Sequence, residues 1–150
     1  MNKQKQDKKP ETVVFDGAGA ILGRLCTRCA KLALQGSEVV VVNVENAFIS
    51  GGSEHIISRY AARRHMTQKA NPENAAKWPR RPDYFFKAVM RGMVPKHSAR
   101  GKNALSRIIA HIGVPAGIDV SKALTVKNKD KLGSNGISIL ELCRKLGWNK

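Results

Sequence analysis

The sequence predicts an α/β fold, in which helices pack against a parallel sheet. Residues 12–16, TVVFD, are rich in β-branched side chains and indicate a strand. Residues 20–35 place apolar side chains three or four positions apart, as one face of a helix does. Residues 38–44, EVVVVNV, are nearly all apolar, which is typical of a central parallel strand covered on both faces. Strand, helix and strand in this order form a βαβ unit, and 150 residues is the length of a single domain.

The next elements are shorter and less regular. Residues 47–50 predict either a short edge strand or the approach to the turn at Gly51-Gly52. Ser53 predicts the N-cap of a helix that runs to about residue 69, because its hydroxyl can accept a hydrogen bond from a free backbone N–H. Residues 71–81 contain prolines and predict irregular chain.

The second half of the chain alternates helical and extended segments. Pro82 suits the first position of a helix, and Gly92 follows the expected end of that helix. Ser98 predicts the cap of the next helix. The elements expected here are a helix at 82–91, a helix from the Ser98 cap to about residue 107, strands at 108–112 and 124–127, and a C-terminal helix at 137–148.

Positive charge is concentrated in the middle of the chain. The sequence has 27 Lys and Arg against 11 Asp and Glu, a formal net charge of +16. Residues 11–54 have a net charge of −2, whereas residues 55–107 hold thirteen basic and two acidic residues, a net charge of +11. Like charges at this density repel one another unless an anion neutralises them. The middle of the chain is therefore expected to meet a polyanion.

Nucleic acid is the polyanion that the residue types favour. Eight of the basic residues at 55–107 are arginines, which bind phosphate oxygens through paired hydrogen bonds and stack on bases. An acidic protein or a lipid surface is the alternative partner. No apolar run approaches the roughly 20 residues that a membrane span needs. Residues 1–10 are polar and lysine-rich, unlike a secretory signal, so we expect a cytoplasmic protein.

The cysteines predict packing and no chemistry. Cys26 and Cys29 form a C-x-x-C pair, but a second pair of ligands with zinc-site spacing is missing from the sequence. Both fall on the apolar face of the helix expected at 20–35, where small buried side chains are the better interpretation. Cys143 has the same interpretation in the C-terminal helix.

One motif is typical of an enzyme. Gly17-Ala-Gly19-Ala-Ile-Leu-Gly23 follows a strand and opens a helix, as a dinucleotide-binding turn does, and Glu45 follows the second strand, where a ribose-binding acid would lie. The third glycine comes one position late, and the remaining chain is too short for a cofactor domain with a substrate site. A tight turn without ligand is the preferred interpretation. An NAD(P)-dependent enzyme is the alternative; otherwise no catalytic residue, metal, cofactor or small-molecule substrate is predicted.

Basic side chains recur at helical spacing between residues 53 and 107. Arg59 and Arg63 are four residues apart, as are Lys87 and Arg91. Such like-charged pairs cost an isolated helix about 0.2–0.5 kcal/mol each, and a phosphate between them removes that cost. The alternative for these basic pairs is a helix face that only meets solvent. For Trp78 the alternatives are stacking on a splayed base and packing on its own domain. The predicted RNA-binding residues are Arg59, Arg63, Arg64, Arg80, Arg81, Lys87, Arg91, Lys96, His97, Arg100, Lys102 and Arg107.

The segment at residues 89–115, VMRGMVPKHSARGKNALSRIIAHIGVP, resembles the signature of the large-subunit ribosomal protein L-thirteen family. Further features that resemble this family are Leu22-Gly23-Arg24-Leu25, Val42-Asn43 with Ser50-Gly51, Arg81-Pro82-Asp83 in the form of archaeal and eukaryotic members, and the archaeal-type ending LELCRKLGW at 140–148.

This resemblance implies a three-layer α/β sandwich with a small, mostly parallel four-stranded sheet flanked by helices, plus basic extensions. Composition, charge and periodicity divide the chain into a disordered basic arm at 1–11 and one domain at 12–150, with a basic insertion at 53–107 and the C-terminal helix at 137–148. The resemblance implies a structural constituent of the large ribosomal subunit that binds large-subunit rRNA, contacts neighbouring ribosomal proteins and supports rRNA folding and assembly for translation. A translational regulator acting outside the ribosome is the alternative.

Overall fold

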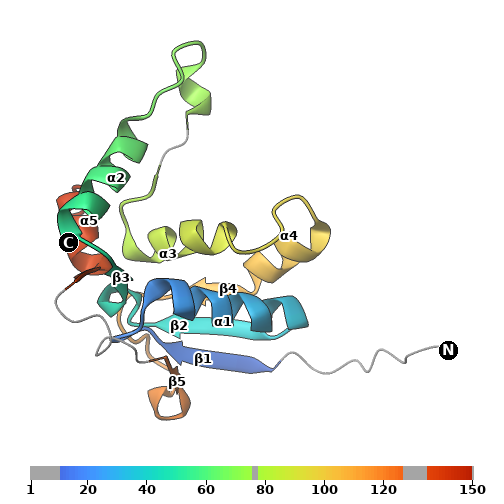
Figure 1. Cartoon of the computed structure of the whole chain (residues 1–150). Helices are drawn as coiled ribbons and strands as arrows, with labels where there is room; N and C mark the ends of the chain where they lie inside the picture. Colours follow the sequence, from blue (N-terminus) through green and yellow to red (C-terminus); the bar gives the residue numbers. More distant parts are fainter. Residues whose placement is uncertain (1–10, 76–77, 127–134, 150) are drawn as a thin grey trace.

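A four-stranded parallel sheet forms the centre of the molecule. The fold was obtained as a computed structural model that describes residues 11–75, 78–126 and 135–149 (Figure 1). The strand order is β4-β2-β1-β5, and each neighbouring pair is parallel. The strands are β1 (Thr12–Asp16), β2 (Glu38–Val42), β4 (Ile108–Ala110) and β5 (Leu124–Thr125). The predicted α/β class and parallel four-stranded sheet are therefore confirmed. The predicted arm at 1–11 falls almost wholly outside the described residues.

The predicted βαβ unit is confirmed. Strands β1 and β2 pair with Val13 opposite Val39 and Phe15 opposite Val41. Helix α1 (Leu22–Gln35) connects them and ends at Gly36, whose φ of 109° lies in the left-handed region that glycine adopts without strain. Strand β2 ends two residues earlier than expected, because Asn43 turns the chain with a φ of 52°.

Helices cover one face of the sheet. Helix α1 contacts both α3 (Pro82–Arg91) and α4 (Ala99–Ser106), and α3 and α4 contact β4, so the three helices form one layer (Figure 1). Phe85, Phe86 and Met90 of α3 are fully buried in this layer. The 3-10 helix η3 (Val120–Lys122) contacts strand β1. Helix α3 matches its predicted bounds because Pro82 begins it and Gly92 follows it.

Two helix starts differ in how well the sequence locates them. Helix α2 (Ser53–His65) has Gly52 as its N-cap, so the prediction that Ser53 caps it is wrong, and the helix stops four residues before residue 69. In contrast, the Ser98 hydroxyl accepts a hydrogen bond from the Gly101 N–H at 3.2 Å, as predicted for the cap of α4.

The C-terminal segment corrects the predicted helix at 137–148. Residues 136–138 form strand β6 (Gly136–Ser138), which pairs antiparallel with β3 (Phe48–Ser50) in a second, two-stranded sheet. Helix α5 covers only Ile139–Lys145. Its start is set by Ser138, whose hydroxyl accepts a hydrogen bond from the Glu141 N–H at 3.1 Å. Ile137 is a buried residue of strand β6. The sequence analysis assigned it to the following helix, because its apolar side chain also fits the helical spacing.

All three cysteines are buried in the core, as predicted. Burial raises the pKa of the Cys29 thiol and of the Cys143 thiol from 9.0 to about 12. Burial also raises the pKa of Cys26 well above its ordinary value. The C-x-x-C pair is therefore protonated at neutral pH, and the described residues include no group of three potential metal ligands.

We expect the folded protein to resist thiol reagents. At pH 8 a shift from 9.0 to about 12 lowers the thiolate fraction about 1,000-fold. Native protein treated with a disulfide reagent should therefore react far more slowly than protein unfolded in urea, which should titrate three thiols. Fast reaction of two thiols in the native state would contradict the buried placement of Cys26 and Cys29.

Gly101 marks a close backbone contact that a methyl group would disrupt. A Cβ at Gly101 would overlap the Pro95 carbonyl oxygen, whereas a Cβ at Gly23 in α1 would meet nothing within 4 Å. We expect Gly101→Ala to lower the free energy of unfolding by roughly 1–3 kcal/mol through overpacking. Gly23→Ala should raise it by up to about 1 kcal/mol through helix propensity. Urea unfolding followed by circular dichroism measures both, and equal effects of the two changes would refute the contact.

Candidate nucleic-acid interface

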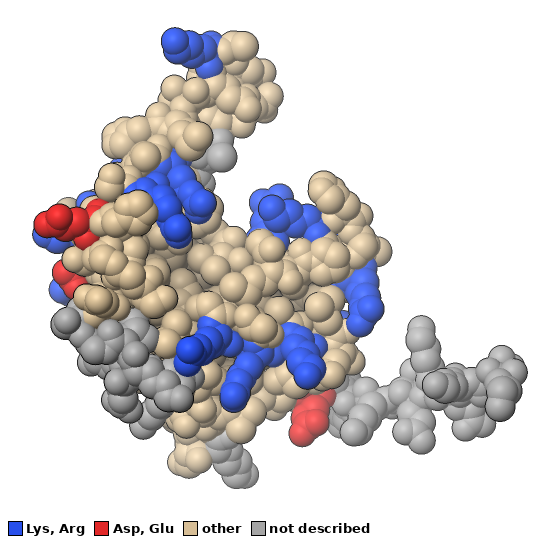
Figure 2. Space-filling view, viewed as in Figure 1, with Lys and Arg blue, Asp and Glu red and all other residues tan. Residues whose placement is uncertain are grey.

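A groove opens between helix α2, helix α3 and the chain that leads into α4. Figure 1 shows the three elements around this opening, and Figure 2 shows Lys and Arg on both of its sides. The hollow has a volume of about 950 Å³. Its lining comprises Tyr60, Arg63, Trp78, Pro79, Tyr84, Lys87, Ala88, Val89, Arg91, Gly92, Lys96 and Leu105. Four of these residues are basic and none is acidic.

An aromatic cluster joins α2 to α3 at one end of the groove. The ring centroids of Tyr60 and Phe85 are 5.0 Å apart, and those of Tyr60 and Trp78 are 5.5 Å apart. Trp78 also meets Phe85 edge-on at 5.9 Å. Such edge and tilted contacts are favourable for aromatic pairs. Trp78 is half-buried among these rings, so it packs on its own domain while one part of it lines the groove.

Arginines of α2 lie over these rings. The Arg63 guanidinium is 5.2 Å from the Trp78 centroid and 5.5 Å from the Tyr60 centroid. Arg59 lies 5.2 Å from the Tyr60 centroid, and its Nη2 donates to the Tyr60 hydroxyl at 3.4 Å. A cation–π contact of this kind favours one placement of the guanidinium and leaves its N–H donors free. Arg63 is thereby oriented toward the groove before any ligand binds.

The other wall of the groove is a row of cations on α3 and beyond it. Lys87 and Arg91 are one helical turn apart and both line the groove, as the spacing predicts. Lys96 lies beside them on the following segment. A second hollow of about 480 Å³ shares these three residues and continues to Lys102 on α4. The two hollows thus form one basic channel along α3.

Two predicted binding residues are engaged within the protein. Arg81 Nη2 and Nε donate to the Asp83 carboxylate at 2.8 and 3.1 Å, and the guanidinium lies 5.0 Å from the Tyr84 ring. This pair places Asp83 in the first turn of α3, where a negative charge is favourable. Arg64 Nη1 donates to the Trp78 carbonyl oxygen at 2.6 Å and so ties the segment before α3 to α2.

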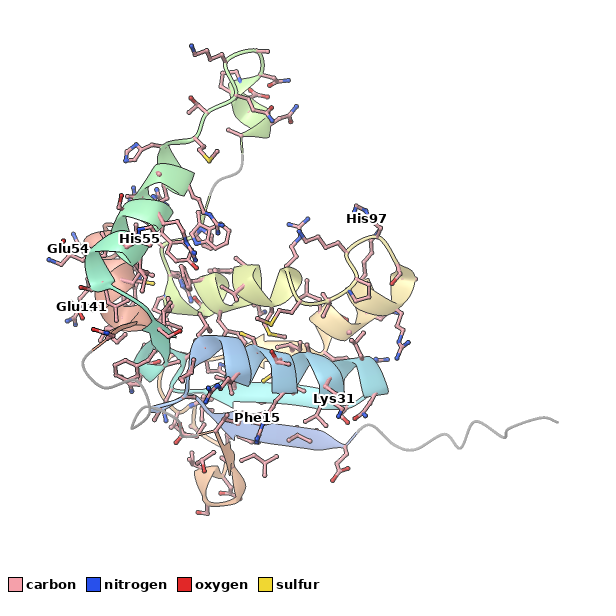
Figure 3. The ribbon with its side chains drawn as sticks, viewed as in Figure 1. Phe15, Lys31, Glu54, His55, His97 and Glu141 are labelled. Carbon is pink, nitrogen blue, oxygen red and sulfur yellow. The ribbon has the colours of Figure 1, made fainter. Side chains whose placement is uncertain are left out.

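Four other predicted residues lie away from the groove lining. Arg100 Nη2 donates to the Leu34 carbonyl at 3.3 Å, and Arg107 Nη1 donates to the Ala33 carbonyl at 3.4 Å, so both are at the C-terminal end of α1. The Arg80 guanidinium lies near Gly147, after α5. His97 is exposed on the loop before α4 (Figure 3). The predicted set is therefore divided among several surfaces.

The glycine-rich turn is occupied by contacts within the fold. One Asp16 carboxylate oxygen accepts hydrogen bonds from the Ala18 N–H at 2.9 Å and from Asn43 Nδ2 at 3.0 Å. A Cβ at Gly17 would come within 2.9 Å of the Asn43 carbonyl oxygen, which accounts for the glycine. The Glu45 carboxylate accepts the Gly113 N–H at 3.0 and 3.1 Å. These contacts favour the tight-turn interpretation over a dinucleotide site.

Tyr84 is a groove residue that the sequence analysis did not select. The residue is 54% exposed, whereas Phe85 and Phe86, which follow it in α3, are fully buried. The sequence could have indicated this placement. Tyr84 is one helical turn before Lys87 and Ala88 and is not on the apolar face of the helix expected at 82–91. An exposed ring next to cations can stack on an unpaired base.

In the described part of the chain, no helix is long and apolar enough to cross a bilayer.

Comparison with known proteins agrees with the signature at 89–115. The family model described as Ribosomal protein L13 matches residues 10–116. The large ribosomal subunit protein uL13 of Methanococcus maripaludis is 40% identical over 109 residues, which cover 72% of this chain and 80% of the relative. The proteins of the same name in Aeropyrum pernix and Methanocaldococcus jannaschii are 36% and 37% identical, over 91% and 89% of this chain and 90% and 96% of theirs.

These relatives are structural ribosomal proteins of archaea, and their family is not known as one of enzymes. The family match extends from β1 to the segment after β4, and the alignments with relatives continue through most of the remainder. The chain therefore belongs to the ribosomal protein L13 family, as an archaeal-type member.

Proposed function

We propose that this protein is a structural constituent of the large ribosomal subunit and binds large-subunit rRNA through the basic channel along α3. The observation that carries the proposal is the groove with four cations and no carboxylate in its lining. The relatives are named as large ribosomal subunit proteins, which supports the choice of rRNA as the polyanion. The protein then acts in the cytoplasm within the ribosome, beside neighbouring ribosomal proteins.

The channel binds RNA mainly through its phosphates. Folding of rRNA brings phosphates close together, and their repulsion opposes compaction. Lys87 and Arg91 are held along one wall by the buried face of α3, and Lys96 on the following segment adds a third positive charge. Arg63 also lines the groove, with its guanidinium in cation–π contact with Trp78. Contacts of this kind recognise the shape and backbone of RNA more than its sequence.

Four of the remaining predicted residues have other roles in this proposal. Arg64 and Arg81 position Trp78 and Asp83, and thereby the two helices that form the groove. Lys102 and His97 extend the binding surface onto α4 and the loop before it. By holding RNA against a rigid α/β core, the protein stabilises the local rRNA fold during assembly of the subunit.

Removing two charges from the channel should weaken RNA binding and its salt dependence. We expect Lys87→Gln with Arg91→Gln to lower the slope of log affinity against log salt by about 1.4, since each phosphate contact on a single strand contributes roughly 0.7. The matched control removes two exposed charges from α5, Arg144→Gln with Lys145→Gln, and should leave affinity near that of the wild type. Filter binding to large-subunit rRNA between 50 and 200 mM salt, about the range in which such contacts are lost, measures both. Identical slopes for the two variants would refute the channel as the RNA site.

Arg81 and Arg91 should respond differently although both are exposed arginines. Arg81 is already paired with Asp83, whereas Arg91 makes no hydrogen bond or ion pair with the residues that the structure describes. Arg91→Gln should reduce the salt slope by about 0.7, and Arg81→Gln should leave the slope almost unchanged while lowering the unfolding midpoint. A larger loss of RNA affinity from Arg81→Gln than from Arg91→Gln would show that the wrong arginine has been placed at the RNA.

A further inference from the structure

Helix α1 carries a second row of cations outside the channel. Arg24, Arg28 and Lys31 follow one another at spacings of four and three residues, so they fall within about 60° of arc around the helix axis. All three side chains are exposed. They extend along about 10.5 Å of the helix. Figure 2 shows Lys and Arg gathered over α1, and Figure 3 labels Lys31 on this helix.

The row lies on the exposed face of α1, and the opposite face of this helix is buried in the core. Leu25, Cys26 and Cys29 of α1 are fully buried against the layer of helices and the sheet. The helix contains no Asp or Glu, so its three cations have no carboxylate one turn away. Among the residues that the structure describes, the one ion pair joins Arg81 to Asp83, and neither residue belongs to α1. The charge on α1 is thus left for an external anion.

The fold adds two more arginines at the C-terminal end of the same helix. Arg100 and Arg107 donate to the carbonyl oxygens of Leu34 and Ala33, at the end of α1. Cations at a helix C-terminus are favourable because they meet its partial negative charge. Arg100 remains exposed, so its guanidinium has further donors for a ligand. We define the α1 surface as Arg24, Arg28, Lys31, Arg100 and Arg107.

The α1 surface and the channel are separate. None of the residues that line either hollow of the channel belongs to α1. The two surfaces share α4, which contributes Lys102 to the channel and Arg100 to the α1 surface. A single strand of RNA lying in the channel would leave the α1 surface without an anion.

We propose that the α1 surface binds the phosphate backbone of a second RNA segment, so that the protein bridges two segments that are distant in the rRNA. This inference rests on the proposed function and adds a second site to it. An extended row of arginines and a lysine suits the regular spacing of phosphates along a strand. An acidic protein partner is the outcome to be distinguished by experiment.

The test is the formation of a complex with two RNA molecules. The full chain is mixed with a donor-labelled and an acceptor-labelled single-stranded RNA of about 12 nucleotides at low salt, where phosphate contacts are strongest. Energy transfer between the labels reports that both are held on one protein. The variants are Arg24→Gln with Arg28→Gln on α1, Lys87→Gln with Arg91→Gln in the channel, and the control Arg144→Gln with Lys145→Gln.

Bridging predicts that the wild type and the control give energy transfer. The α1 variant should lose most of that signal, by about tenfold, yet still bind one labelled RNA through the channel. Arg24→Lys with Arg28→Lys should restore it, because charge is retained. Energy transfer from the glutamine α1 variant at the wild-type level would overturn the inference and leave the surface to a protein partner. If the channel variant also bound both RNAs normally, the proposed function itself would fail.

Discussion

The packing of helix α3 into the layer of helices is the interaction on which the functional surface depends. Phe85, Phe86 and Met90 are fully buried, and they fix both the position and the rotation of the helix. With that face committed to the core, Lys87 and Arg91 are held at the groove. Burial of two phenylalanines and a methionine stabilises by several kcal/mol, on the order of 1.5–3 each, which exceeds the repulsion between Lys87 and Arg91 one helical turn apart.

The same principle explains how a strongly basic chain remains folded. No charged residue is buried among the described residues, so the cations repel one another near the surface, where water and salt screen them. On α2, where the apolar face is narrow, aromatic rings replace aliphatic packing. Tyr60 and Trp78 support the α2–α3 junction and also lie under the arginine side chains. Stability and preparation of the binding site therefore use the same contacts.

Some elements were predictable because their signals are local. Helix α3 begins at a proline and is followed by a glycine, and α4 begins after a serine that caps it, so both were located from short patterns. Strand β6 was not, because Ile137 has the same apolar character in a strand as in a helix. Its state is decided by pairing with Ile49, nearly ninety positions earlier in the chain. Helix α2 was predicted too long because its buried apolar side chains end at Tyr60, and residues 66–69 are all exposed, so no burial extends the helix beyond His65.

The sequence by itself determined the α/β class, the sign and location of the charge, the lack of a membrane-spanning run and, through the residues at 89–115, the family. Composition and short-range spacing are sufficient for these, because each depends on residues close together in the chain. Tertiary structure alone decided which cations act together. It assigned Lys87, Arg91 and Lys96 to one channel, paired Arg81 with Asp83, and placed Arg100 and Arg107 beside α1. Those contacts join residues as many as 74 positions apart, and only the packing of the apolar faces brings such residues within hydrogen-bond distance.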